Sequence, residues 1–147
     1  MMKRILLIST CALVLLVLCS CTAKEQDNMQ IKTNKAVTFV NSVQEADVWI
    51  LPMTQENLKT TMWGTATAKS VKTGESRKTP LCEAGDDGQY IFRMIDTDEM
   101  YYSANGIKLE AGWTAEVKGD ELNSITLEVK NADGEVDATY EVFAARL

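Results

Sequence analysis

Histidine is absent from all 147 residues, so the side chain that most often performs acid–base catalysis at neutral pH is missing. A Ser-His-Asp triad, a Cys-His pair and an imidazole zinc ligand are therefore excluded. Carboxylates remain as candidate acids, bases or calcium ligands, in groups at Asp86-Asp87, Asp96-Thr97-Asp98-Glu99 and Asn131 to Asp137. None of these groups matches an EF-hand loop, and Asp and Asn at such spacing are typical of turns. We expect no enzyme activity, no metal and no cofactor.

Four cysteines are present, and only Cys82 lies beyond residue 21. One remaining cysteine cannot form an internal disulfide framework. Cys82 could form an intermolecular disulfide, act as a reactive thiol, or be a small and partly buried apolar residue. We favour the last interpretation, because no histidine could activate the thiol and the acidic residues that follow it would raise its pKa.

Tyr101 and Tyr102 are the best candidates for a binding role. Adjacent residues of a strand point to opposite faces, so one tyrosine should be exposed, next to a turn expected at Asn105-Gly106. An exposed tyrosine beside a turn can anchor a partner, although it is also common on β surfaces. The candidate binding loop consists of Tyr101, Tyr102, Ser103 and Asn105.

The N-terminal segment has the features of a targeting signal. Lys3 and Arg4 precede an uncharged apolar run of 14 residues, from Ile5 to Leu18. A membrane-spanning helix needs roughly 20 apolar residues, so this run has the length of a signal peptide. The sequence Leu18-Cys19-Ser20-Cys21 follows, and it resembles the lipobox of bacterial lipoprotein precursors.

The lipobox resemblance implies cleavage after Ser20, diacylglycerol on the sulfur of Cys21 and acylation of the new amino group. Two acyl chains suffice for stable anchoring, so the membrane would hold the mature protein without being spanned by it. Thr22 follows the cysteine. By analogy with enterobacterial lipoproteins, this favours the outer membrane, facing the periplasm or the surface, if the source has two membranes. The alternatives are a secretory signal cleaved near Ala23 and an uncleaved anchor.

Charge limits the partners of the mature chain. Without residues 1–20, 13 Lys and Arg remain against 21 Asp and Glu, a net charge of −8. This balance argues against nucleic acid as a ligand. An acidic domain is also repelled by an anionic membrane surface, so we expect it to stand off on a tether. Residues 21–35 are polar and predict that flexible tether, followed by one folded domain at 36–147.

Alternation of apolar and polar residues dominates 36–147 and predicts an all-β domain. The alternation is clearest at the C-terminus, where Ile125, Leu127 and Val129 face Val136, Ala138, Tyr140 and Val142 across a turn at 131–135. A second hairpin is expected to turn at Asn105-Gly106. Other strands are predicted at 37–41, 47–53, 61–71, 90–95 and 113–117, with one short helix at 54–59 and a structureless loop at 72–88.

About eight short strands without a βαβ rhythm predict a small antiparallel β-sandwich. A closed β-barrel is the alternative. We prefer the sandwich because the predicted strands are short and unequal in length.

The stretch from Ser103 to Leu109, within residues 103–121, is similar to the Ser-Ala-Ser-Gly-x-x-Tyr stretch of membrane-bound C-type lysozyme inhibitors. Those are small β-barrel lipoproteins whose loop enters the lysozyme cleft. Here Asn105 replaces the second serine, Leu109 replaces the tyrosine, and Cys82 has no partner for that family's disulfide.

The sequence as a whole predicts a membrane-anchored envelope lipoprotein with a binding or structural role, acting through loops at one end of the sandwich. Its expected partners are the membrane, through the lipid, and a protein of the envelope. The alternative is an inhibitor of a lysozyme-type cell-wall hydrolase, which an acidic surface would suit. Catalysis ranks third.

Overall fold

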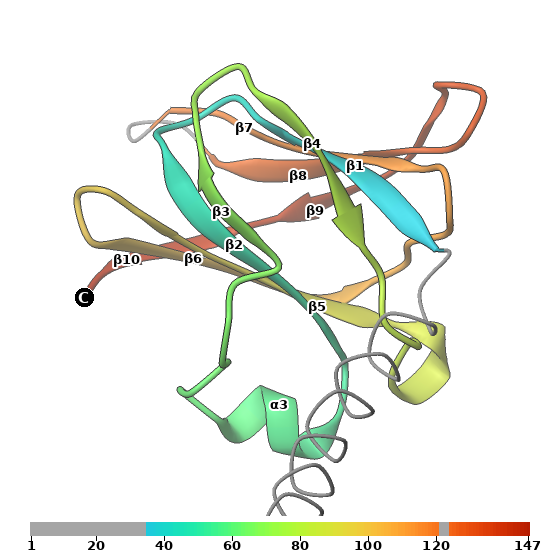
Figure 1. Ribbon diagram of the computed structural model, residues 1–147, viewed down its shortest axis with the longest axis horizontal. Coiled ribbons are helices and arrows are strands. Elements are labelled where there is room, and N and C mark those ends of the chain that lie inside the picture. The colour runs from blue at the N-terminus through green and yellow to red at the C-terminus, as the bar shows by residue number, and fades with distance from the viewer. Residues whose placement is uncertain (1–34, 121–123) are drawn as a thin grey trace, which may run out of the picture. The chain divides into compact units, whose positions relative to one another are not determined.

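The computed structural model describes residues 35–120 and 124–147. The predicted signal peptide, Cys21 and nearly all of the predicted tether lie outside the described residues. Ten strands form two five-stranded sheets that lie one above the other (Figure 1). Within the described residues the two sheets remain open, so the predicted β-sandwich is confirmed and the barrel alternative is wrong. No helix in this part of the chain is long and apolar enough to cross a membrane.

Sheet I has the strand order β4-β1-β7-β8-β9. Its strands are β4 (Ser76–Pro80), β1 (Ala36–Asn41), β7 (Thr114–Lys118), β8 (Thr126–Lys130) and β9 (Val136–Glu141). The β1–β7 pair is parallel and the other pairs are antiparallel.

Sheet II has the order β10-β6-β5-β2-β3, with every pair antiparallel. Its strands are β10 (Phe143–Arg146), β6 (Met100–Ile107), β5 (Tyr90–Asp96), β2 (Ala46–Pro52) and β3 (Ala68–Val71). The predicted short helix is confirmed as α3 (Gln55–Lys59), whose first turn is capped by the side chain of Thr54. A 3-10 turn, η1 (Asp86–Gly88), precedes β5.

The core lies between the sheets and consists of side chains from alternate strand positions. The rings of Phe39 from sheet I and Phe92 from sheet II meet with centroids 5.9 Å apart. Each such side chain contributes roughly 1.5–3 kcal/mol when it is fully buried. Leu127, Val117, Met94 and Tyr102 are among the other large side chains that are fully buried. This packing fixes which face of each strand points outward.

The predicted C-terminal hairpin is confirmed by β8 and β9. Leu127 lies opposite Tyr140, and Leu127 is buried while Tyr140 packs against the core. Val136 was predicted to point inward but is exposed. The register shifts between Val129 and Lys130, so Val136 pairs with Lys130 on the outer side of the sheet.

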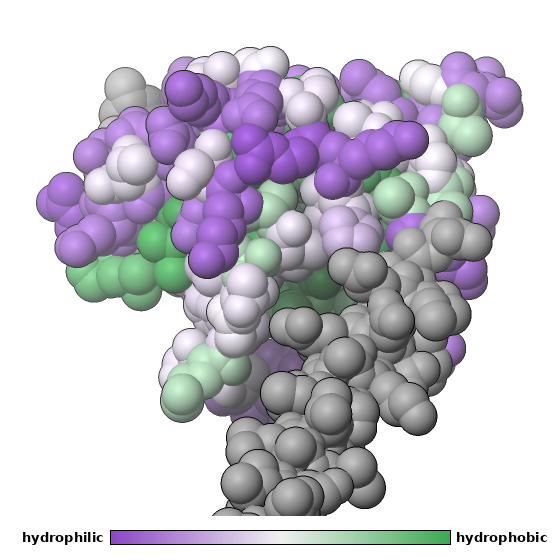
Figure 2. Space-filling view, in the orientation of Figure 1, coloured by the Kyte–Doolittle hydropathy of each residue, from purple (hydrophilic) through white to green (hydrophobic). Residues whose placement is uncertain are grey.

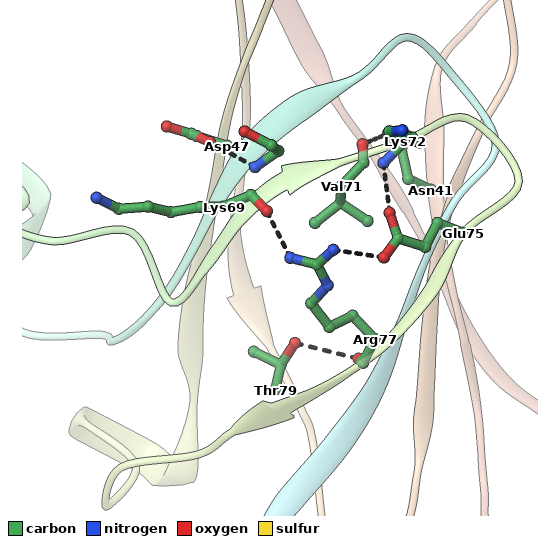
Figure 3. A network of polar contacts seen from close by, with 9 residues as sticks. Asn41, Asp47, Lys69, Val71, Lys72, Glu75, Arg77 and Thr79 are labelled. Carbon is green, nitrogen blue, oxygen red and sulfur yellow. Dashed lines mark hydrogen bonds and ion pairs between the residues drawn. The ribbon is translucent and has the colours of Figure 1, made fainter.

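The loop predicted at 72–88 is wrong, because β4 and η1 lie within it. A network of polar contacts holds the β3–β4 connection (Figure 3). Arg77 forms an ion pair with Glu75 and donates to the carbonyl oxygen of Lys69, while Glu75 accepts from the backbone N–H of Lys72 at 2.9 Å. Asn41, fully buried at the end of β1, donates to the carbonyl of Val71 at 2.7 Å. These contacts join sheet II to sheet I at this end of the sandwich.

The turn predicted at Asn105-Gly106 is also wrong. Strand β6 continues through both residues, and the register shifts where Gly106 adopts a φ of 72°. The hairpin instead turns just after Asp96, whose Oδ1 accepts the backbone N–H groups of Asp98 and Met100, each at 2.9 Å.

The strand predicted at 61–71 is shorter than expected. Only Ala68 to Val71 is extended and paired, as β3. Gly64 adopts a φ of 66°, which interrupts the extended backbone. The ring of Trp63, just before this glycine, packs against Trp49 of sheet II.

Candidate functional site

The outer face of sheet II carries two rows of side chains that cross the strands. Residues directly opposite each other in antiparallel strands share a face, so pairing defines each row. The first row runs from β10 to β2 as Phe143, Ser103, Arg93 and Trp49. The second row runs parallel to it as Ala145, Tyr101, Ile95 and Asp47. The two rows place charged, polar and aromatic groups together outside the core.

Arg93, at the centre of the first row, is 5% exposed. Its Nη1 donates to Oδ1 of Asn105 at 2.8 Å, to the carbonyl of Phe92 at 2.8 Å and to that of Ala104 at 3.3 Å. All three acceptors are neutral. Among the described residues no carboxylate forms an ion pair with Arg93. The guanidinium is therefore largely buried, and no described carboxylate balances its charge.

Burial lowers the pKa of the Arg93 guanidinium from its ordinary value, and Tyr101 opposes this shift. The guanidinium nevertheless stays charged at neutral pH, because arginine side chains keep their proton in proteins. Buried charges in proteins are normally paired, since desolvation of a lone ion is costly. An unpaired buried cation in this position is a candidate anion-binding group.

Three aromatic rings form a cluster on this face, and one of them, Trp49, lies directly opposite Arg93 in the β2–β5 pair. Trp63 stacks on Tyr101 with ring centroids 5.5 Å apart, and its other neighbour is Trp49, also at 5.5 Å, edge to face. Each indole is held by a backbone carbonyl: Trp49 Nε1 donates to Gly64 at 3.2 Å, and Trp63 Nε1 donates to Thr60 at 2.9 Å. These contacts fix the loop between α3 and β3 against the sheet. All three rings stay partly exposed.

A hollow of about 340 Å³ opens on the other side of Trp49. Its acidic lining includes Glu45 and Asp47, and Asp47 accepts the backbone N–H of Ser70 at 2.7 Å. Ser70 adopts a left-handed φ of 48°, which this bond helps to hold. The face is therefore positive at Arg93 and negative beyond Trp49.

Apolar residues extend the face toward β10. Figure 2 shows hydrophobic residues gathered at the surface over β6 and β10. Phe143 is 64% exposed and Leu147, which follows β10, is 69% exposed. Exposed apolar surface beside polar groups is typical of a contact site.

Three of the four residues of the predicted binding loop belong to this face. Tyr101, Ser103 and Asn105 point outward from β6, so they lie in a strand rather than in a loop. Tyr102 points into the core, is 2% exposed, and donates its hydroxyl to Asp96 at 2.8 Å. The prediction that the two tyrosines occupy opposite faces is confirmed. Cys21 lies outside the described residues.

Arg93, Trp49 and Trp63 were not among the binding residues predicted from the sequence. One available signal was that Arg93 is the single charge between Tyr90 and Ile95, in an otherwise apolar strand. The aromatic cluster had no comparable signal. Trp63 contacts the sheet from the loop before β3, and the sequence predicted that loop as part of a strand.

Cys82 is exposed, which differs from the partly buried position we favoured. Neighbouring atoms still desolvate its sulfur, and this burial raises the pKa of the thiol. The raised pKa was predicted, but its main cause is desolvation rather than the acidic residues nearby. In residues 35–120 and 124–147, no group of three or more Cys, Asp or Glu side chains is arranged to hold a metal ion.

The outer face of sheet II thus combines a buried guanidinium, aromatic rings and polar side chains. The side-chain hydroxyl of Ser103 and the amide nitrogen of Asn105 form no hydrogen bond with any described residue, so both can bond to a ligand. No protein-family model, curated protein or solved structure matches this chain.

Proposed function

We propose that the protein is a lipid-anchored envelope lipoprotein that binds a ligand through the outer face of sheet II. The observation that carries the binding role is the unpaired guanidinium of Arg93 beside Trp49, Trp63 and Tyr101. A structural role alone would not require a buried charge there, since an apolar residue would fit the sheet at lower cost. Partly exposed aromatic rings supply contact area with little loss of conformational freedom.

The anchor is proposed from the lipobox at Leu18 to Cys21. Acylation of Cys21 would hold the domain at the membrane, and the net charge of −8 would keep it away from an anionic surface. Metabolic labelling with palmitate tests this proposal. Wild type and Cys82→Ser should take up label, whereas Cys21→Ser should not. Absence of label in wild type would overturn the anchor.

Retention of small molecules tests the binding face. Full-length protein in detergent is incubated with an envelope extract, washed, and analysed by mass spectrometry for the compounds it retains. Wild type should retain a compound that Trp63→Ala loses, because Trp63 lies across Trp49 and Tyr101. Thr139→Ala, on exposed β9 of the other sheet, is the control and should retain it. If wild type and Trp63→Ala retain the same compounds, this face is not the binding site.

Inhibition of a lysozyme-type hydrolase is the second proposal. The acidic charge supports it, since such hydrolases are cationic and electrostatic attraction favours encounter. The lysozyme-inhibitor-like stretch at 103–109 has its first five residues within β6, so the contact would have to use the face of the sheet. Capture of lysozyme by wild type, and its loss in Tyr101→Ala, would support this role. We propose no catalytic activity.

A further inference from the structure

We propose that Arg93 binds the carboxylate of a singly charged organic acid whose ring lies against Trp49, Trp63 and Tyr101. This inference rests on the proposed function of the same face and names the class of its ligand.

One edge of the Arg93 guanidinium, formed by Nε and Nη2, makes no hydrogen bond with a described residue. Nη1 holds all three of the hydrogen bonds that Arg93 makes through its side chain, and among the described residues Nε and Nη2 have no partner. No fully enclosed side-chain nitrogen or oxygen of the described residues lacks a partner. The Nε and Nη2 groups therefore keep contact with solvent. Two parallel N–H groups on one edge of a guanidinium match the two oxygens of a carboxylate.

The surrounding charges favour an anion of one charge. Glu45 and Asp47 line the hollow beyond Trp49, and Asp47 belongs to the row next to Arg93. A phosphate with up to two negative charges would be repelled by these carboxylates more strongly than a monocarboxylate. The acidic balance of the whole chain acts in the same direction.

The side chains around the guanidinium indicate the chemistry of the part of the ligand that lies beyond its carboxylate. Trp49, Trp63 and Tyr101 present partly exposed rings, which pack against an aromatic ring or the apolar face of a sugar ring. Ser103 and the amide nitrogen of Asn105 lie in the same region and can bond to hydroxyl groups. A sugar acid and an aromatic acid share this chemistry, and the experiment separates them.

Titration of full-length protein in detergent tests the inference, with tryptophan fluorescence and calorimetry as readouts. The probes are glucuronate and benzoate, and glucose and benzyl alcohol are their uncharged counterparts. At least one acid should bind at millimolar concentration, and its uncharged counterpart should bind about tenfold more weakly or not at all. Preference for glucuronate identifies a sugar acid, and preference for benzoate an aromatic one.

Asn105→Asp is the decisive variant, because it places a carboxylate where Oδ1 accepts from Arg93 at 2.8 Å. The new ion pair should satisfy the guanidinium internally, so binding of the acid should fall about tenfold or more while the melting temperature stays the same or rises. Asn131→Asp, in the β8–β9 turn, adds the same charge far from this face and should bind like wild type. Arg93→Lys keeps the charge but loses the two-pronged geometry, and should weaken binding about tenfold.

The outcomes separate this inference from the proposed function. If neither acid binds, or if the uncharged counterparts bind equally well, the carboxylate inference is overturned. It is also overturned if Asn105→Asp binds like wild type. A compound from the envelope extract that depends on Trp63 would still leave the binding face in place. If retention does not depend on Trp63, the proposed function itself fails.

Discussion

Leu127 and Tyr140 lie directly opposite each other on β8 and β9, and both side chains turn toward the core. Leu127 is 1% exposed. Leu127→Ala should therefore lower the free energy of unfolding by about 2–5 kcal/mol, through lost burial and the cavity left behind. Urea denaturation of the chain from Thr22 onward measures this change. A midpoint equal to that of wild type would mean that β8 does not line the core.

Glu128, the next residue along β8, supplies the contrast. It points outward and forms ion pairs with Lys118 at 2.6 Å and Lys130 at 3.3 Å. Its side chain is 15% exposed, so the ion pairs are partly shielded from solvent. Glu128→Ala should cost about 0.5–1 kcal/mol, which is well below the cost of Leu127→Ala. A larger loss from Glu128→Ala than from Leu127→Ala would reverse the assignment of the two faces.

The same glutamate predicts a dependence on pH. Hydrogen bonding from Lys118, followed by that from Lys130, lowers the pKa of Glu128 below its ordinary value. A carboxyl group whose pKa is lower in the folded state stabilises the fold above its unfolded pKa, about 4.3, and loses this contribution as the pH falls through the folded pKa. Glu128→Gln should thus be less stable than wild type at neutral pH. The difference should shrink as the solution is acidified below the unfolded pKa. Urea midpoints across that range would contradict this if the difference grew.

Gly85 is required by a close approach of two backbone segments. Its N–H donates to Gln89 and the next residue, Asp86, donates to Met53 at 2.7 Å. A Cβ at this position would lie 2.0 Å from the carbonyl oxygen of Met53. Because backbone atoms cannot move aside, Gly85→Ala should cost about 3 kcal/mol or more in urea denaturation.

Gly134 is the matched control for Gly85. It lies in the β8–β9 turn with a φ of 84°, and a Cβ there would meet nothing within 4 Å. Gly134→Ala should cost about 1 kcal/mol, through the left-handed backbone alone. Equal costs at the two glycines would show that the contact with Met53 does not constrain the fold.

The strands that the sequence predicted correctly are those with a clear alternation on a half-buried sheet. Strands β1, β7 and β8 show this alternation, and burial of one face fixes their register. Strands β4 and β10 were missed, and each lies at the edge of its sheet. Strand β4 has the sequence Ser-Arg-Lys-Thr-Pro. An edge strand with charged side chains has little apolar pattern to detect.

The Asn105-Gly106 pair shows where local signals mislead. The pair is the strongest short-range signal for a two-residue turn, because both positions tolerate a positive φ. Gly106 does adopt a positive φ, but within β6, where the register of β5–β6 shifts. The positive φ of Gly106 was thus predictable. Its position at a register shift inside β6, rather than in a turn, depends on how β6 pairs with β5.

The candidate site was predictable only in part, for a related reason. Tyr101, Ser103 and Asn105 follow one another at alternate positions, so their shared face follows from period two. Arg93 and Trp49 join them through strand pairing across β5 and β2, and Trp63 through a loop. Such neighbours are distant in sequence, and a single sequence contains no signal for that pairing.

Replacement of Arg93 by methionine separates a binding role from a structural one. Methionine has a similar length and no charge, so Arg93→Met removes the unpaired buried cation while filling most of its space. The free energy of unfolding should stay within about 1 kcal/mol of wild type or increase, because no ion pair is lost. Phe92→Ala, one residue earlier and 1% exposed in the core, should cost about 3–5 kcal/mol. If Arg93→Met destabilises the domain as much as Phe92→Ala, then Arg93 is retained for the fold, and its bonds to Asn105 and the strand carbonyls are sufficient reason for its presence.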